Sequence, residues 1–102
     1  MAGFWREQGK RVSRSSGWSA TRALRIRYDG GRCRACGRKI NLQVHHIKPF
    51  HLDQTMELDM SNLITLCGRC HILLGHLDNW KSHNRQVIFD TITTRRRIED
   101  RP

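Results

Sequence analysis

The chain has 102 residues, which suits one small domain, and only 37% of them are hydrophobic. A domain with so limited a core commonly needs a metal or disulfides as reinforcement. The 19 Lys and Arg residues outnumber the 9 Asp and Glu residues, and the formal net charge of +10 favours a nucleic-acid partner over a merely basic surface. No apolar run suits a membrane span or a secretory signal, so we expect a cytoplasmic protein with no membrane partner.

The first half of the chain predicts a leader, a helix and a short strand. Residues 1–17 are rich in Arg, Ser and Gly and are expected to form a flexible basic leader. A helix is expected from about Ser19, a possible N-cap, to Tyr28, because apolar residues recur there at helical spacing, and the two glycines at positions 30 and 31 end it. Alternation of apolar and polar residues over 42–45 then predicts a strand that stops before Pro49.

The second half predicts a loop over 47–61, a second short strand or extended turn over 62–66, and a helix over 70–77. A further helix is expected from about residue 84, with Val87, Ile88 and Ile92 on one face that packs Trp80 or Trp18. The expected organisation is therefore a leader over 1–17, a core over 18–80, and a basic helical extension over 81–102.

Four cysteines form two pairs with the same two-residue spacer, Cys33 with Cys36 and Cys67 with Cys70. Zinc binds four thiolates tetrahedrally at ~2.3 Å, and this spacer lets each pair bind one ion without strain. Two disulfides are the alternative, and they suit a secreted protein better. The spacing fits no common iron–sulfur pattern. We therefore expect a structural zinc whose closed coordination leaves no position for substrate and whose binding contributes folding free energy.

A zinc site leaves His45, His46 and His71 unexplained. Because successive residues of a strand point to opposite faces, His45 and His46 are expected to contact different partners. His71 directly follows Cys70 at the start of the predicted helix, where the zinc would fix its position. Taken singly, each of them could equally be a surface or locally satisfied histidine.

Three segments in order resemble the HNH endonuclease family: Cys33-x-x-Cys36, Val44-His-His-Ile-Lys-Pro49, and Ser61-Asn-Leu-Ile-Thr-Leu-Cys-Gly-Arg-Cys-His71. The resemblance covers about residues 18–77. It implies a small zinc-stabilised α+β domain with a ββα-metal, treble-clef-like core and flanking helices. The core would be two short antiparallel strands and a helix that together hold a catalytic divalent cation. The family includes phage packaging nucleases, restriction and homing enzymes and bacterial toxins, so a bacterial or phage origin is expected.

Residue by residue, the resemblance implies a role for each matching position. His46 would be the general base that activates water, and Asn62 would orient the long loop and hence the base. His45 and His71 would bind the catalytic metal. Two imidazoles without a carboxylate make a soft site, so Mn²⁺, Co²⁺ or Ni²⁺ is expected to bind more tightly than Mg²⁺.

The other histidines are weaker candidates. Some family members have a third histidine ligand four residues after the one at the helix start, but that position is Gly75 here. His76 lies about 140° further around an α-helix from His71, so it is not expected to bind the metal. His51 could approach the phosphate or the metal, and His83 is expected at the surface.

The expected function is a divalent-metal-dependent DNA endonuclease that hydrolyses phosphodiester bonds, nicking one strand with low sequence specificity. A non-catalytic zinc-stabilised nucleic-acid-binding module is the rival hypothesis. A homodimer, or an accessory subunit with a targeting or packaging partner, is compatible with either. Basic side chains near the motifs are candidate phosphate contacts: Arg22, Arg25, Arg34, Arg38, Lys48 and Arg69.

Overall fold

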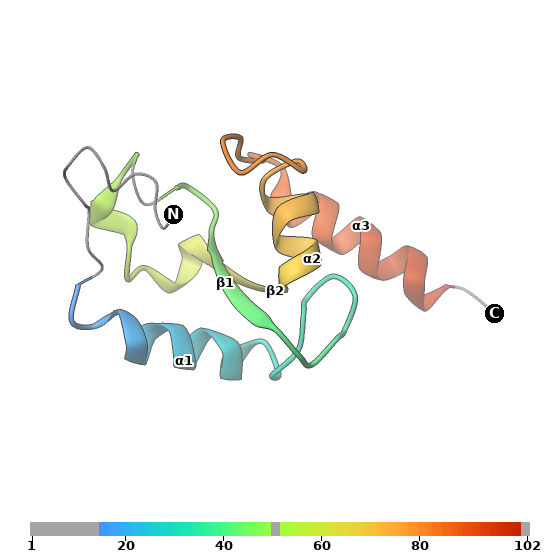
Figure 1. Ribbon diagram of the computed structural model, residues 1–102. Coiled ribbons are helices and arrows are strands. Elements are labelled where there is room, and N and C mark those ends of the chain that lie inside the picture. Colours follow the sequence, from blue (N-terminus) through green and yellow to red (C-terminus); the bar gives the residue numbers. More distant parts are fainter. Residues whose placement is uncertain (1–14, 50–51, 101–102) are drawn as a thin grey trace.

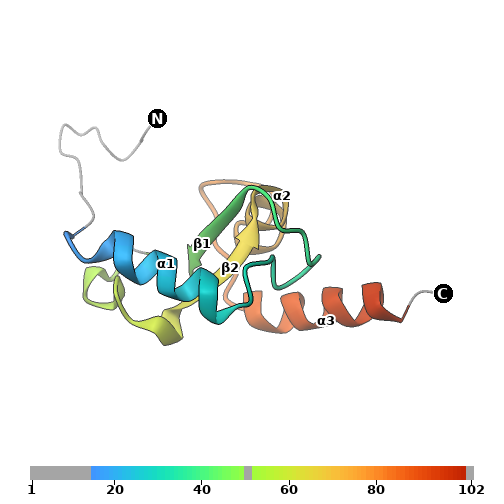
Figure 2. The same ribbon diagram turned by 90° about the horizontal axis from the view of Figure 1, so that it is seen from below.

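The computed structural model describes residues 15–49 and 52–100, which form a small α+β domain around two strands. Helix α1 (Trp18–Tyr28) lies along one side of the strands. The short helix α2 (Gly68–Cys70) and the longer α3 (Val87–Glu99) lie at the other side, as the two views in Figures 1 and 2 agree. The α+β expectation is therefore confirmed. In the described part of the chain, no helix is both long enough and apolar enough to span a membrane.

The sheet has two antiparallel strands, β1 (Leu42–His46) and β2 (Leu63–Cys67). Their register sets Leu42 opposite Cys67 and His46 opposite Leu63. Alternation along β1 turns Val44 and His46 to one face, and Gln43 and His45 to the other. Both expected strands are confirmed, and the alternation separates the two adjacent histidines as predicted.

The loop between the strands contains two single 3₁₀ turns, Gln54–Met56 and Met60–Asn62. Each begins after an aspartate whose carboxylate accepts a hydrogen bond from the backbone two residues on, Asp53 from Thr55 and Asp59 from Ser61. Such Asx turns satisfy backbone donors where no sheet partner exists. Residues 53–61 of the expected irregular loop thus follow a defined path.

The helix expected over 70–77 is present but has a different winding. After the single turn of α2, residues His71–Gly75 form the π-helix η4, which ends at His76. A π-helix bonds residue i to residue i+5, so the residue five places further along lies about one turn above the first. This changes which side chains share a face with His71.

The core lies between the sheet and the two cysteine pairs, and the first turn of α3 packs onto it. Val87 at the start of α3 is fully buried and Thr91 one turn later is 3% exposed. The helix is confirmed, and Val87 faces inward as expected. The other two residues of the expected face, Ile88 and Ile92, are exposed, and Thr91 is buried in their place. The ring of Trp18 stacks on His46, and the ring of Trp80 contacts His71 and His76.

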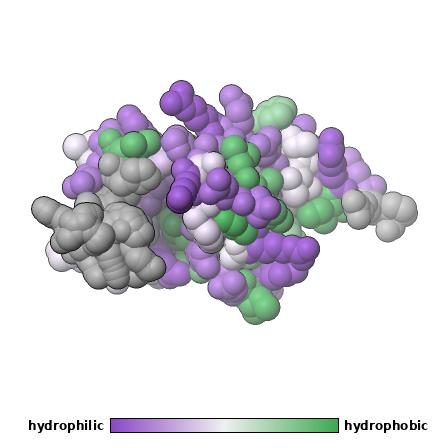
Figure 3. All heavy atoms as spheres, turned by 45° about the horizontal axis from the view of Figure 1, so that its top comes forward, coloured by the Kyte–Doolittle hydropathy of each residue, from purple (hydrophilic) through white to green (hydrophobic). Residues whose placement is uncertain are grey.

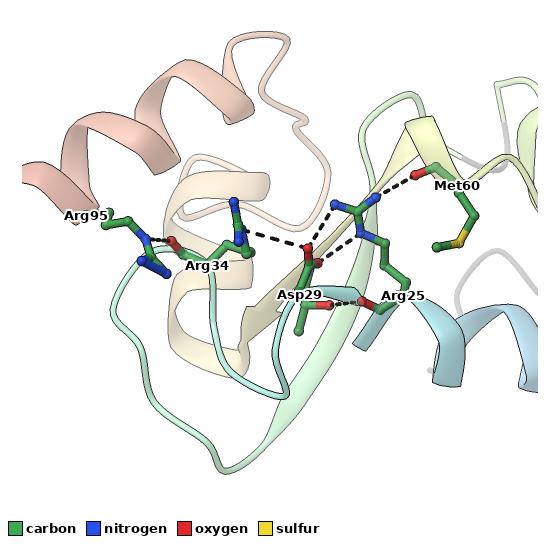
Figure 4. Close-up of polar contacts among 6 residues, drawn as sticks. Arg25, Asp29, Arg34, Met60 and Arg95 are labelled. Carbon is green, nitrogen blue, oxygen red and sulfur yellow. Dashed lines mark hydrogen bonds and ion pairs between the residues drawn. The ribbon is translucent and has the colours of Figure 1, made fainter. Parts of the chain in front are cut away.

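A buried carboxylate joins α1 to the outer edge of β2 (Figure 4). The side chain of Asp29 is 1% exposed, and it accepts two hydrogen bonds from the guanidinium of Arg25, at 2.9 and 3.0 Å. It also accepts one from the backbone N–H of Thr65, at 3.0 Å. The carbonyl of Thr65 accepts from the backbone N–H of Arg34. Both backbone groups of Thr65 on the unpaired edge of β2 are thereby satisfied without a third strand.

Candidate metal centres

The four cysteines come together as the sequence predicts. Their sulfur atoms all lie within 4.8 Å of one another, and Sγ of Cys36 is 3.7 Å from Sγ of Cys67. Four sulfurs at ~2.3 Å from one tetrahedral zinc would lie ~3.8 Å apart. None of the four is in a disulfide. The cluster fits a structural zinc, and its burial leaves little room for a substrate.

Backbone geometry prepares both cysteine pairs for one ion. Gly37 follows the first pair with φ +82, a conformation that glycine adopts readily, and its N–H donates to the carbonyl of Cys33. At the second pair, a Cβ on Gly68 would collide with the amide of Asn41. A hydrogen bond from the Cys70 thiol lowers the pKa of Cys33 to about 4, and the same bond raises the pKa of Cys70. One thiolate is therefore already stabilised, and a cation would favour the others.

Three histidines form a second group of potential ligands on the other face of β1. His45, His71 and His76 each offer a ring nitrogen, and these nitrogens lie within 4.8 Å of one another. Nδ1 of His45 and Nε2 of His71 are 3.1 Å apart. Two nitrogens bound to one ion at ~2.1 Å would be ~3.0–3.4 Å apart, so the two rings are spaced for a shared metal.

His76 corrects the sequence prediction. An α-helix would have turned it about 140° away from His71. Because the chain winds as a π-helix over His71–Gly75, His76 instead comes within 4.9 Å of His71 and 5.0 Å of His45, measured between ring centroids. The i, i+5 spacing thus supplies a third imidazole that the sequence pattern gave no reason to expect.

Two of the rings are oriented by acceptors at their far nitrogens. Nδ1 of His71 donates to Oε1 of Gln43 at 2.6 Å, and Nδ1 of His76 donates to the carbonyl of Ser82 at 2.7 Å. A neutral imidazole that carries its proton on Nδ1 has its lone pair on Nε2. Such outer hydrogen bonds fix the tautomer of histidine ligands in metal sites. Gln43 precedes His45 by two residues, so strand alternation could have indicated its position but not its partner.

The burial of His45 also fits a metal. A metal shared with Nε2 of His71 would take the Nδ1 lone pair of His45, so Nε2 would carry the proton of the neutral ring, and this Nε2 is buried without a hydrogen-bond partner within the part of the chain that the structure describes. Burial and the nearby imidazoles of His71 and His76 lower the pKa of His45 to about 3, and burial lowers that of His71 to about 4. Both rings are therefore neutral at pH 7, which is the form that binds a cation. The residues present fit a divalent metal.

Gly75 is required by the position of His45. A Cβ built on Gly75 would lie 2.9–3.2 Å from three atoms of the His45 ring. A histidine ligand four residues after His71 would occupy this position, 75. The space that such a side chain needs is filled by the His45 imidazole, and His76 takes the place next along the chain.

The comparisons with known proteins agree with this arrangement. The family model described as HNH endonuclease matches residues 33–77, a segment that contains both cysteine pairs, both strands and His71. These residues form an HNH domain. No curated protein and no solved structure matches the chain. The match supports a nuclease-type function in general, and the zinc-stabilised ββα-metal architecture with flanking helices is confirmed.

His46 lies on the opposite face of the HNH strand from the three-histidine group. Its ring stacks on Trp18 of α1, with centroids 4.8 Å apart, and Nε2 donates to the carbonyl of Glu57 at 3.1 Å. Because a carbonyl can only accept, Nε2 carries the proton of the neutral ring and Nδ1 carries the lone pair. Across the strand, repulsion from the protonated form of His46 contributes to lowering the pKa of both His45 and His71.

Asn62 holds the loop of the HNH domain to the end of β1. It is 3% exposed, and its Oδ1 accepts from the N–H of Lys48 at 2.8 Å. Its Nδ2 donates to the carbonyls of Lys48 and Met56, at 3.1 and 3.4 Å. Met56 precedes Glu57, whose carbonyl binds His46, so the Asn62 amide braces the segment that orients this imidazole.

The basic side chains divide into buried and exposed ones. Arg25 is 15% exposed and is bonded to Asp29 and to the carbonyl of Met60, so it supports the fold, and its contact with phosphate stays a prediction. The guanidinium of Arg22 donates to the carbonyl of Leu42 and is partly buried. The remaining candidates are exposed: Arg34, Arg38, Lys48 and Arg69. His51 and residues 1–14 of the expected leader lie outside the described residues.

Proposed function

We propose that this chain is a DNA endonuclease that hydrolyses phosphodiester bonds with one divalent cation. The observation that carries the proposal is the group of three converging imidazoles within an HNH domain, one strand position away from His46. His45 and His71 were implied as ligands by the resemblance, and His76 is added here from its position. A zinc ion held by the four cysteines would be separate and structural.

His46 is proposed as the general base. Its Nδ1 lone pair is suited to accept a proton from water, since the Glu57 carbonyl fixes the proton of the neutral ring on Nε2. Stacking on Trp18 restricts the ring, and Asn62 holds the loop that supplies the carbonyl. A bound divalent cation would supply charge stabilisation at the phosphate and at the departing oxygen.

The ligand set should determine which metals support cleavage. The three-histidine group contains no carboxylate, and imidazole nitrogen favours Mn²⁺, Co²⁺, Ni²⁺ or Zn²⁺ over Mg²⁺. Finding a third imidazole strengthens this expectation. Equal activity with Mg²⁺ and with Ni²⁺ would contradict the ligand assignment.

Low sequence specificity is proposed from the kind of surface that would face DNA. Lys48 follows His46 by two residues and Arg69 precedes His71 by two, and both are exposed cations. Such side chains contact phosphates and carry no base information. Figure 3 shows a largely hydrophilic face on which hydrophobic residues lie in small separate patches. One compact site would cut one strand per encounter, so a double-strand break would need a second copy, a second visit or a targeting partner.

The test is cleavage of supercoiled plasmid by the wild type, His46→Ala and His83→Ala in Mn²⁺ and in Ni²⁺. We expect nicked circles before linear product for the wild type and for His83→Ala, which removes a histidine outside the three-histidine group. His46→Ala should bind DNA but cut at least 100-fold more slowly. Linear product without an earlier nicked species would contradict single-strand nicking. Equal cleavage by all three proteins would contradict His46 as the base.

A further inference from the structure

A tryptophan stands beside the three-histidine group and remains open to solvent. Trp80 is 61% exposed. Its ring meets His71 edge-on at 5.2 Å and His76 at 4.8 Å, measured between ring centroids. It lies in the loop that joins η4 to α3, drawn in orange at the top of Figure 1. An indole in this position contacts two of the proposed metal ligands and still presents apolar surface outward.

The loop that carries Trp80 has a defined backbone. Leu77 and Asp78 both adopt positive φ, 54 and 62, which is uncommon for residues with a Cβ. The N–H of Asp78 donates to the carbonyl of Ile72 at 2.7 Å, and the N–H of Asn79 donates to that of His76 at 3.0 Å. Two unfavourable backbone conformations are thus maintained by bonds to the helix that carries the histidines. These hydrogen bonds hold the start of the loop in place and so position Trp80 beside the histidines.

The chemistry of an exposed indole next to a phosphate-handling site points to a nucleobase. Every base has an aromatic face, and bases stack on tryptophan with little regard to sequence. Lys81 is the next residue and is exposed, which adds a cation for the phosphate of the same nucleotide. Bases inside a duplex are already stacked on their neighbours, so only an unpaired base can use the indole without a cost for unstacking.

We propose that Trp80 is a stacking platform for an unpaired nucleobase next to the scissile phosphodiester. The preferred substrates are then single strands and duplexes with a mismatch, gap or overhang. The proposal rests on the proposed nuclease function and specifies its substrate class. It makes Trp80 a substrate-binding residue rather than a cover over the histidines.

The first experiment compares cleavage rates on a fully paired duplex and on the same duplex with a three-nucleotide gap. The proteins are the wild type, Trp80→Ala, Trp80→Phe and the matched control Phe89→Ala, which removes an aromatic ring of similar exposure (66%) from α3. We expect the wild type and Phe89→Ala to prefer the gapped substrate. Trp80→Ala should lose about 5- to 150-fold in kcat/KM on gapped DNA and little on paired DNA. Trp80→Phe should recover part of the loss because it keeps a ring.

The second experiment separates stacking from a role at the metal. Zinc-loaded His46→Ala protein, with and without Trp80→Phe, is titrated with single-stranded oligonucleotide while tryptophan emission is followed. The emission that belongs to Trp80 should be quenched on binding. The Ni²⁺ affinity of Trp80→Ala, measured by calorimetry, should stay within about threefold of the wild type.

The outcomes distinguish this proposal from the nuclease function itself. A wild type that cuts neither substrate with any metal would refute the nuclease function. A wild type that cuts both, with the same preference after Trp80→Ala, would refute the stacking platform alone. Equal loss on both substrates together with weakened Ni²⁺ binding would make Trp80 a cover over the histidines, and would also overturn the proposal.

Discussion

Replacing Gly75 by alanine tests the close packing on which the three-histidine group depends. In an ordinary helical position the substitution would stabilise the protein by ~1 kcal/mol, because glycine is a poor helix former. Here the added Cβ would lie 2.9 Å from Cε1, 3.0 Å from Nδ1 and 3.2 Å from Nε2 of His45. The sign of the effect should therefore reverse.

The magnitude follows from these distances. Carbon atoms in contact are ordinarily ~3.5–4.0 Å apart, so the His45 ring must move by roughly 0.5 Å or more. Metal–ligand distances tolerate only about 0.2 Å. Overpacking costs ~1–3 kcal/mol, which leaves a net destabilisation of up to ~2 kcal/mol after the helix gain. Affinity for Ni²⁺ should fall about 10- to 100-fold, as it does when the support of a ligand is disturbed.

The assay is calorimetric titration of zinc-loaded protein with Ni²⁺, alongside urea unfolding. Gly17→Ala is the control, because a Cβ at Gly17 would lie 3.1 Å from Cδ1 of Leu58, the far end of a flexible side chain that can move aside. We expect Gly17→Ala to bind Ni²⁺ as the wild type does. Unchanged Ni²⁺ affinity in Gly75→Ala would refute the reasoning, since His45 would then either lie outside the site or be free to shift without loss.

Three further perturbations test other parts of the structure. Asp29→Ala leaves the mostly buried guanidinium of Arg25 without its carboxylate and should lower the free energy of unfolding in urea by ~3–5 kcal/mol. Glu99→Ala breaks an exposed ion pair and should not change this free energy measurably. Equal effects of the two substitutions would contradict a stabilising role for the buried Asp29 carboxylate. Cys36→Ser should lose zinc, measured by mass spectrometry, and melt at a lower temperature, and a variant that melts as the wild type does would show that the ion is dispensable. Gln43→Leu should weaken Ni²⁺ binding about 10- to 100-fold without loss of zinc, and unchanged binding would mean that its bond to the imidazole is incidental.

The features that the sequence predicted well are those encoded by short-range patterns. Two-residue spacers brought each cysteine pair to one point, and the alternation over 42–45 indicated both the strand and the separation of His45 from His46. The glycines at 30 and 31 ended α1 with φ of +80 and +69, as only flexible residues readily do. Local chemistry decides such features, so no tertiary information was needed.

The features that the sequence could not predict depend on contacts between distant segments. The position of His76 depends on a π-helical turn, and no residue in His71–Gly75 signals that winding on its own. Asn84 lies outside the motif, yet its Nδ2 donates to the carbonyl of Leu74 at 2.9 Å and its N–H donates to that of Gly75, also at 2.9 Å. It thereby attaches the end of η4 to the start of α3. The apolar pattern of α3 was right for Val87 and wrong for Ile88 and Ile92, because once Val87 packs into the core the residue one turn later on the same face is Thr91.

The two candidate centres are connected so closely that the zinc is expected to affect chemistry in which it takes no direct part. Cys70 is bonded covalently to His71, and Cys67 ends the strand that pairs with β1. On β1, Leu42 pairs with Cys67, and the next residue, Gln43, accepts a hydrogen bond from Nδ1 of His71. Loss of zinc would release the second cysteine pair, and with it both the start of the π-turn and the register that places Gln43 and His45. Metal affinity at the histidines should therefore fall when zinc is removed, even though no atom of that group binds the zinc.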